Sequence, residues 1–432
     1  MPTERRSVGS ENGTILTLGG MSLADVARDP RIGTPAYVYD LDAIAAEARE
    51  LKAGFDAAPH LVAYAVKANS AGPIIKALAA EGCGADVVSG AELTLAMRCG
   101  VRPDQIVFSG VAKTDAELDL ALSAGDAGIG AIQVESVEEI PRIAARARAA
   151  SRVARVSLRL NPAVDMEALD THSYIATGHD EAKFGVPLSS VPEALDRLAA
   201  LPSMRLVGVG SHVGSQLTAT EGYLASAKEL FAFARDVGSR FPLAFIDCGG
   251  GFGIDYGDGC PVRPADFVRA TLALQKESGL GHLALYCEPG RSLVAAHGVL
   301  VARVIQRKIA EPRRWVMIDA GMNDLMRPAL YQARHRIVPV STADTPATIR
   351  PYRVVGPVCE SSDDFGVHEL PDADFQEVAI LDAGGYGYSM ASRYNGRALP
   401  AEVFLRGGSI ASFTARSGPD EWIADRLRAV TP

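Results

Sequence analysis

The stretch Leu61-Val62-Ala63-Tyr64-Ala65-Val66-Lys67-Ala68-Asn69 is a short apolar run that ends in a lysine. Its first six residues show no polar alternation, which predicts a strand buried on both faces. Lysine is seldom fully buried, and desolvation disfavours its charged form. Lys67 could therefore be a Schiff-base lysine with a lowered pKa, or a lysine whose ammonium reaches back to solvent from the strand end. This stretch alone leaves both interpretations open.

The composition is that of a globular protein large enough for a barrel and a second domain. The chain has 432 residues, of which 48% are hydrophobic and 22% charged. Its net charge of -9 argues against a nucleic-acid or anionic-membrane surface. The polar start and the lack of a long apolar run predict neither a secretory signal nor a membrane span. The six cysteines have no metal-ligand or disulfide spacing, so we expect no metal site and a cytoplasmic protein with reduced thiols.

From Leu61 onward, strand-like runs alternate with helix-like segments. Helix signals include Thr114 as an N-cap and Gly100 and Gly125 as stops. Eight strand–helix repeats over about 230 residues are typical of a (β/α)₈ barrel, a TIM-type α/β fold. The expected strands are 61–66, 86–89, 106–109, 131–134, 153–160, 205–210, 243–247 and 283–287, and the expected helices are 91–99, 114–124, 136–150, 191–201, 222–237 and 264–277.

The sequence on either side of the barrel lacks its alternation of strand-like and helix-like segments. Residues 1–33 are polar and glycine-rich, and we expect a loose start. Strand-like runs separated by Pro, Gly and Asp turns follow residue 291, which predicts a mainly antiparallel β-domain. The strand expected at 35–39 lacks the barrel rhythm and is assigned to that domain. The expected organisation is an N-terminal segment 1–45 that contributes a strand to the β-domain, a barrel 46–291 and a C-terminal β-domain 292–432.

In such a barrel the chemistry lies where the strands end. Polar, reactive or glycine-rich residues follow nearly every expected strand, although each alone could be a cap or turn residue. The glycines at 249–251 follow the seventh strand, beside the usual phosphate site of these barrels, although a packing turn is the alternative. The strand-end residues are Lys67, Asp86, Ser109, Glu135, Arg159, His212, Ser215, Gly250, Gly251, Glu288, Gly290 and Arg291.

A lysine beside a phosphate site suggests pyridoxal 5'-phosphate. That cofactor requires a Schiff-base lysine, a phosphate cradle and a charge partner for its pyridine nitrogen. Glu288 is a candidate for the partner, and His212 could lie flat against the ring. In the β-domain, Cys359 stands beside Glu360, where a buried thiol acting as a small hydrophobe is the alternative.

Together these residues resemble a known family. YAVKAN (64–69), HVGSQ (212–216), CGGGFG (248–253), EPGR (288–291), MNDLMRPALY (322–331), GPVCESSDDF (356–365) and GYGYSMASRYN (385–395) resemble the diaminopimelate decarboxylases, which are fold-type III pyridoxal-phosphate enzymes related to ornithine decarboxylase and alanine racemase. The stretch 161–185 also resembles that family's strand-five loop. Two positions depart from the family pattern: Gly385 replaces an alanine, and Gln332 replaces a glycine.

The resemblance implies specific roles. Lys67 would hold the cofactor as a Schiff base, His212 would stack on its ring, and Glu288 would pair with its nitrogen. Cys359 would donate the proton that replaces the lost carboxylate, and Glu360 would bind the far ammonium of the substrate. The Cys359 loop would reach into the site of a second subunit, so a homodimer is implied. The remaining implied cofactor contacts are Asp86, Arg159, Ser215, Gly250, Gly251, Gly290, Arg291 and Tyr386, and the implied substrate contacts are Arg291, Arg327, Tyr331 and Tyr386.

The implied reaction is decarboxylation of meso-2,6-diaminopimelate to L-lysine. Arginine suits a distal carboxylate because its fork binds both oxygens. The alternatives are a decarboxylase for ornithine, lysine or carboxynorspermidine, an amino-acid racemase, and a non-catalytic protein that binds pyridoxal phosphate. The pair Arg291 and Arg327 with Glu360 argues against the first two substrates, and the thiol loop argues against the racemase. The complete β-domain argues against the non-catalytic protein.

Overall fold

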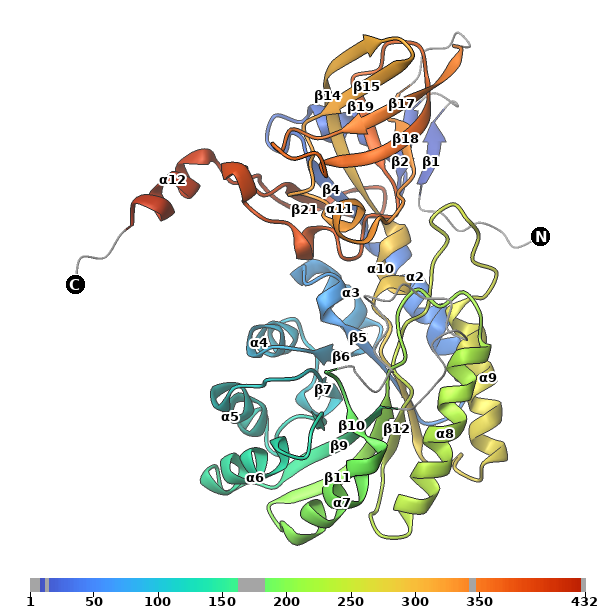
Figure 1. Cartoon of the computed structure of the whole chain (residues 1–432), viewed down its shortest axis with the longest axis vertical. Coiled ribbons are helices and arrows are strands. Elements are labelled where there is room, and N and C mark those ends of the chain that lie inside the picture. The colour runs from blue at the N-terminus through green and yellow to red at the C-terminus, as the bar shows by residue number, and fades with distance from the viewer. Residues whose placement is uncertain (1–7, 12–14, 162–182, 342–346, 429–432) are drawn as a thin grey trace. The chain divides into compact units, whose positions relative to one another are not determined.

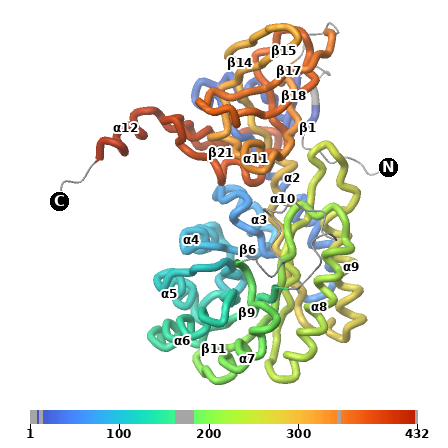
Figure 2. The backbone as a smooth tube through the Cα atoms, viewed as in Figure 1, coloured from blue at the N-terminus to red at the C-terminus, as the bar shows by residue number. Residues whose placement is uncertain are grey.

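The computed structural model describes residues 8–11, 15–161, 183–341 and 347–428. By its internal contacts the chain forms two compact units (Figure 1). The barrel unit comprises Ala45–Ile254 and Cys260–Ser292. The β unit comprises Met1–Ile44, Asp255–Gly259 and Leu293–Pro432, so it gathers three segments that are far apart in sequence. The same path can be followed along the backbone in Figure 2.

Within the described residues, eight parallel strands form a closed barrel, as the sequence predicts. Each pairs in parallel with its neighbour, and the pairing of the last strand with the first closes the ring. Most of their residues are buried, which explains the lack of polar alternation. The strands are β5 (His60–Ala65), β6 (Gly84–Val87), β7 (Ile106–Phe108), β8 (Ala131–Val134), β9 (Ala154–Asn161), β11 (Met204–Ser211), β12 (Phe245–Asp247) and β13 (Ala284–Cys287), with the two-residue β10 (Val186–Pro187) beside β9.

Helices cover the outside of these strands (Figure 1). The predicted cap holds: the side chain of Thr114 accepts a hydrogen bond from the Glu117 backbone, and Glu117 bonds back to Thr114. One helix, α3, was not predicted because Gly72-Pro73 reads as a turn, yet proline is tolerated in the first turn of a helix. The helices are α2 (Leu41–Ala53), α3 (Gly72–Ala80), α4 (Gly90–Arg98), α5 (Asp115–Ser123), α6 (Glu139–Ala149), α7 (Val191–Ala200), α8 (Glu221–Gly238), α9 (Pro264–Glu277) and α10 (Arg291–Val294).

The β unit is built on a mainly antiparallel sheet. The predicted N-terminal strand, β4 (Ala36–Asp40), lies between β14 (Gly298–Ala310) and β20 (Ala401–Arg406). Two pairings are parallel, β4 with β20 and β15 with β17. The other strands are β15 (Arg313–Ile318), β16 (Ile337–Pro339), β17 (Ile349–Val355), β18 (Asp364–Pro371), β19 (Glu377–Ile380) and β21 (Ser409–Thr414), and the helices are α11 (Arg327–Tyr331) and α12 (Pro419–Leu427).

The expectation of a loose start over residues 1–33 is wrong for the described part of that segment. It forms a small antiparallel sheet of β1 (Val8–Glu11), β2 (Ile15–Leu18) and β3 (Met21–Ser22), followed by α1 (Leu23–Arg28). Leu18, Leu23 and Val26 are buried in one core cluster with strands of the main sheet. Burial of these side chains outweighs the glycine-rich composition.

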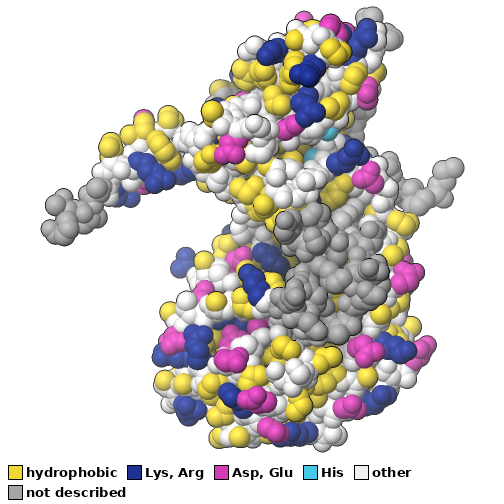
Figure 3. All heavy atoms as spheres, viewed as in Figure 1, with side chains coloured by type: hydrophobic (Ala, Val, Ile, Leu, Met, Phe, Trp, Pro, Cys, Tyr) yellow, Lys and Arg dark blue, Asp and Glu magenta, His cyan; other side chains and the backbone are white. Residues whose placement is uncertain are grey.

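Among the described residues, no helix is both long and apolar enough to cross a bilayer. On the face that Figure 3 shows, basic and acidic side chains are interspersed over both units.

Candidate active site

Lys67 lies just past the end of the first barrel strand. It sits in a short 3₁₀ turn, Val66–Ala68, whose two flanking residues are buried. Its ammonium forms an ion pair with Asp86 of β6, and its side chain is 40% exposed whereas that of Asp86 is 0% exposed. The idea of a lysine desolvated in an apolar strand end is therefore wrong in detail. A carboxylate partner balances its charge, and the second oxygen of Asp86, Oδ1, is buried with no hydrogen-bond partner among the described residues.

Buried carboxyl groups gather at the same mouth. Glu288 follows β13 and Asp247 ends β12, and both are buried. Burial raises the pKa of Asp247 to about 6. Burial, and then the charges of Asp247 and Asp86, raise the pKa of Glu288 well above its usual range. The Ser109 hydroxyl donates a 3.4 Å hydrogen bond to Glu288. Burial and neighbouring negative charge therefore favour the protonated forms of Asp247 and Glu288 more than solvent does.

His212, directly after β11, is held as a neutral acceptor. Its Nδ1 accepts a 3.2 Å hydrogen bond from the backbone N–H of Gly250. Burial, and then the charges of Arg159 and Lys67, lower the pKa of His212 to about 3. The imidazole is therefore uncharged at neutral pH.

The glycines after β12 occupy positions where a larger residue would collide with backbone. A Cβ on Gly250 would lie 2.0 Å from the carbonyl oxygen of Glu288, and one on Gly251 would lie 2.3 Å from that of Gly214. Gly251 also has a φ of +91°. Such a turn allows an anion to approach the backbone N–H groups closely. Next to it, buried Arg291 donates a 3.0 Å hydrogen bond to the hydroxyl of Ser215.

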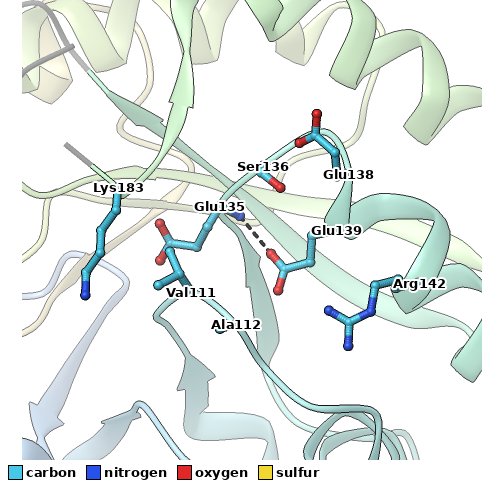
Figure 4. Close-up of a pocket in the computed structure, with 8 residues that line it drawn as sticks. All are labelled: Val111, Ala112, Glu135, Ser136, Glu138, Glu139, Arg142 and Lys183. Atoms are coloured by element: carbon cyan, nitrogen blue, oxygen red, sulfur yellow. Dashed lines mark hydrogen bonds between the residues drawn. The ribbon is translucent and has the colours of Figure 1, made fainter. Parts of the chain in front are cut away.

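Arg159, on β9, is buried against a carboxylate. Its Nη1 lies 3.1 Å from Oε1 of Glu135, the residue that follows β8. Glu135 also lines a cavity of about 270 Å³ at the ends of β7 and β8 (Figure 4). The structure thus brings together, at the strand ends of the barrel unit, ten of the predicted residues: Lys67, Asp86, Arg159, His212, Ser215, Gly250, Gly251, Glu288, Gly290 and Arg291.

The other five predicted residues, Arg327, Tyr331, Cys359, Glu360 and Tyr386, belong to the β unit. Arg327 is buried at the start of α11, with Nη1 2.6 Å from Nε2 of His335 and its guanidinium over the ring of Tyr256. Tyr331 ends the same helix. Tyr386 is half-buried and has a φ of +56°.

Cys359 and Glu360 lie on an exposed loop, which hydrogen bonds to Asp363 hold in place. Asp363 accepts hydrogen bonds of 2.6 Å from the backbone N–H groups of both Val358 and Met322, and so ties the thiol loop to the segment before Arg327. Glu360 accepts hydrogen bonds from Tyr394 and Ser362.

Both departures from the family pattern have a local explanation. Gln332 caps α11 in the left-handed region with a φ of +54°, so a glycine there relieves backbone strain. A Cβ on Gly385 would meet its nearest neighbours at 3.4 Å, so an alanine would fit with little adjustment. The resemblance noted for 161–185 lies mostly outside the described residues, since 162–182 are not described.

Sequence reasoning did not single out three groups that the structure connects to these residues. Lys113 is buried behind Arg159, Asn395 binds the backbone of Cys359, and His335 holds Arg327. Lys113 lies beside a predicted helix cap, where a solvated lysine is the ordinary expectation. The signal that could have found it is its place in the short loop between the expected strand 106–109 and the expected helix 114–124.

A parallel barrel with a lysine after its first strand, a glycine turn after the seventh and a carboxyl group after the eighth defines a pyridoxal-phosphate enzyme of the barrel type. The family described as "Pyridoxal-dependent decarboxylase, pyridoxal binding domain" matches residues 41–295. The diaminopimelate decarboxylase of Zymomonas mobilis is 38% identical to this chain over 97% of it and 98% of the relative. The chain belongs to the diaminopimelate decarboxylase family.

Solved structures agree with this assignment. Diaminopimelate decarboxylase from Helicobacter pylori, complexed with L-lysine, is 37% identical with a TM-score of 0.85, covering 91% of this chain and 97% of that one. The enzyme from M. jannaschii, in co-complex with L-lysine, is 32% identical with a TM-score of 0.90, covering 98% of both chains.

Proposed function

We propose that this chain catalyses the pyridoxal-phosphate-dependent decarboxylation of meso-2,6-diaminopimelate to L-lysine and carbon dioxide, the last step of lysine biosynthesis by the diaminopimelate route. The observation that carries the proposal is the meeting of Lys67, the glycine turn at 249–251 and Glu288 at one barrel mouth. The relatives named diaminopimelate decarboxylase, and the L-lysine in two of their structures, supply the reaction and its product.

The residues at the mouth fit the cofactor. The side-chain nitrogen of Lys67, as the neutral amine, would bind the aldehyde covalently, and the glycine turn with Ser215 offers donors to a phosphate. Gly250, Gly251, Gly290, Arg291 and Tyr386 are the other proposed contacts near the phosphate. Burial raises the pKa of both Glu288 and Asp247, so these carboxyl groups hold a proton more readily than solvated ones, which suits a pyridine nitrogen that must be protonated. When bound, pyridoxal phosphate supplies an electron sink for the bond that breaks.

The protein side chains then have separate tasks. Asp86 holds the amine of Lys67 in place, and the neutral imidazole of His212 offers a flat, uncharged face to the ring. Arg159 places a cation beside these groups. The Sγ of Cys359 holds the proton that is delivered to the carbon from which carbon dioxide has left, as a general acid.

Recognition of the substrate rests on charges at its distal end. We assign the distal carboxylate to Arg291, Arg327 and Tyr331, with Tyr386 nearby, and the distal ammonium to Glu360. The hydroxyls of Tyr394 and Ser362 hold the Glu360 carboxylate in one orientation, which reduces the entropy lost on binding. A site with such charges disfavours a substrate that lacks their partners.

We further propose a cytoplasmic homodimer in which the Cys359 loop of one copy completes the site of the other. In this arrangement, residues 46–291 form the cofactor-binding domain, 292–432 form the β-domain and 1–45 contribute a strand to it. The exposure of Cys359 and Glu360 on one loop supports a role toward a second copy. All six cysteines lie in described segments and are free thiols, in keeping with a reducing compartment.

The reaction is tested by following carbon dioxide release from meso-diaminopimelate, ornithine, lysine and carboxynorspermidine in parallel. We expect turnover of the first to dominate, and faster turnover of any of the others would overturn the substrate assignment. Lys67→Ala should lose the imine absorbance that the wild-type protein shows with pyridoxal phosphate. Persistence of that band would remove Lys67 from its role.

The shared site is tested by mixing two inactive variants, Lys67→Ala and Cys359→Ala. If each site draws these residues from different copies, random exchange of subunits restores about a quarter of the wild-type activity. A mixture that exchanges subunits, as shown by a tagged copy, and stays inactive would contradict the proposal.

A further inference from the structure

Lys113 is a buried lysine that the reaction as described does not use. Its side chain is 1% exposed. The ammonium donates to the carbonyl oxygens of Gly110 at 2.6 Å and Gln133 at 2.7 Å, and it lies 3.0 Å from Oε1 of Glu139. Buried lysine is rare unless it is paired, so this cation has a structural or functional reason.

The carboxylate of Glu139 contacts Glu135 as well as Lys113. Its Oε2 accepts a 3.0 Å hydrogen bond from the backbone N–H of Glu135 (Figure 4). Glu139 begins α6 and is itself buried, so it bridges Lys113 on one side and the strand end that carries Glu135 on the other.

Glu135 in turn accepts hydrogen bonds from three donors at the barrel mouth. Its Oε1 accepts from the backbone N–H of Gly110 at 2.9 Å and from Nη1 of Arg159 at 3.1 Å, and its Oε2 accepts from the backbone N–H of Gly185 at 2.8 Å. Gly110 is therefore fixed twice, through its N–H by Glu135 and through its C=O by Lys113. The arrangement leaves Arg159 little freedom to move relative to the loop ends.

Two like charges are neighbours in this chain of contacts, and each has its own cation. Lys113 pairs with Glu139 and Arg159 pairs with Glu135, so the four side chains together are neutral. Without the lysine, the two neighbouring buried carboxylates would keep, of these two ion pairs, only the one with Arg159. An uncompensated buried charge is costly, and the guanidinium that already contacts Glu135 would be drawn toward the pair.

We propose that Lys113 is a positioning residue, which acts through Glu139 and Glu135 to hold the guanidinium of Arg159 at the cofactor site. This inference rests on the proposed place of Arg159 beside the cofactor. The guanidinium matters there because its charge acts on His212, Asp247 and Glu288, the groups that face the cofactor ring. Displacement of Arg159 would change the electrostatic environment of these three groups and so weaken their contacts with the cofactor ring.

The test measures the affinity of cofactor-free full-length protein for pyridoxal phosphate, by titration of absorbance and intrinsic fluorescence. Lys113→Met should weaken binding by about tenfold or more, the scale of effect that outer-shell partners commonly have. Glu139→Gln keeps an oxygen for the Glu135 N–H and removes one charge. The double variant should therefore bind within about threefold of wild type, because both buried charges are gone together.

A surface ion pair between α5 and α6 provides the matched control. Arg146 of α6 donates to Asp119 of α5 at 2.7 Å, with no connection to Glu135. Arg146→Met should leave the affinity for pyridoxal phosphate unchanged, whatever it does to the melting temperature.

Three outcomes would overturn the inference. Lys113→Met could bind pyridoxal phosphate within twofold of wild type. The losses of affinity for pyridoxal phosphate in Lys113→Met and Glu139→Gln could multiply in the double variant. If Lys113→Met does not fold, a folded double variant that binds tenfold more weakly than wild type would be decisive. Because binding is measured without diaminopimelate, failure of the decarboxylation assay on wild-type protein would leave this result standing.

Discussion

The side-chain oxygen of Asn395 lies 3.0 Å from the backbone nitrogen of Cys359 and accepts its hydrogen bond across 36 residues of sequence. Asn395 has a φ of +57°, a left-handed conformation that asparagine tolerates better than most residues. Its neighbour Tyr394 donates to Glu360. One short turn thus fixes both residues of the thiol loop, the proposed proton donor and the proposed ammonium partner.

The first prediction concerns this turn. Asn395→Gly keeps the left-handed backbone but removes the acceptor, and we expect kcat to fall by about tenfold because the thiol loop loses its position. Asn395→Asp keeps the acceptor and should stay close to wild type. Steady-state kinetics with meso-diaminopimelate measures both. Wild-type kcat in the glycine variant would show that the hydrogen bond does not position Cys359.

The second prediction isolates the thiol itself. Cys359→Ala should lower kcat by about 100-fold or more, the usual contribution of a general acid, while the affinity for pyridoxal phosphate is unchanged. Cys260 is the matched control, since it is also not fully buried and its thiol donates a hydrogen bond to the carbonyl oxygen of Val262, outside the proposed site. Equal activities of Cys359→Ala and Cys260→Ala would remove the proton-donor role.

The third prediction concerns the glycine turn. Gly250→Ala places a methyl group 2.0 Å from the carbonyl oxygen of Glu288, and the backbone must shift to admit it. We expect a loss of about 3 kcal/mol in the free energy of unfolding or a marked loss of affinity for pyridoxal phosphate. Gly238, the last residue of α8, has open space around a Cβ. Gly238→Ala should leave binding unchanged and raise stability by up to about 1 kcal/mol. Denaturation and cofactor titration of the two variants give the comparison, and equal behaviour would refute the steric argument.

The fourth prediction is a pH dependence of stability in the β unit. Burial raises the pKa of Glu402 from 4.5 to about 7, against the opposing effect of a 3.2 Å hydrogen bond from Tyr39. The unfolded carboxyl ionises near its ordinary pKa, so between these values the folded chain binds more protons than the unfolded chain. The contribution of Glu402 to stability is therefore greatest at low pH and falls as the pH rises from about 4.5 to 7, by up to about 3 kcal/mol.

Glu402→Gln should remove that contribution and so flatten the fall. Urea denaturation at pH 5 and pH 8 measures the difference for wild type and variant. The same change at Glu369, an exposed glutamate of β18, is the control and should leave the curve in place. A Glu402→Gln curve parallel to that of wild type would mean that this carboxyl does not titrate differently on folding.

The local periodicity of the sequence was sufficient to predict most of the fold. Each barrel strand was predicted within two residues at either end, and α9 was predicted with its observed bounds, because apolar runs and cap residues act within a few positions of one another. The prediction was wrong for residues 1–33 because their burial depends on strands far along the chain. It missed α3 because Gly72-Pro73 resembles a turn.

For the site, the sequence by itself determined which residues stand at the strand ends, since the order of strands and the residue that follows each are properties of the chain alone. Lys67, Glu288 and the glycines at 249–251 are of this kind. Only the tertiary structure decided the partners: Asp86 for Lys67, Asp247 for Glu288, and Glu139 for Lys113. The energy of a charge depends on burial and on neighbours brought from distant segments, and folding sets both.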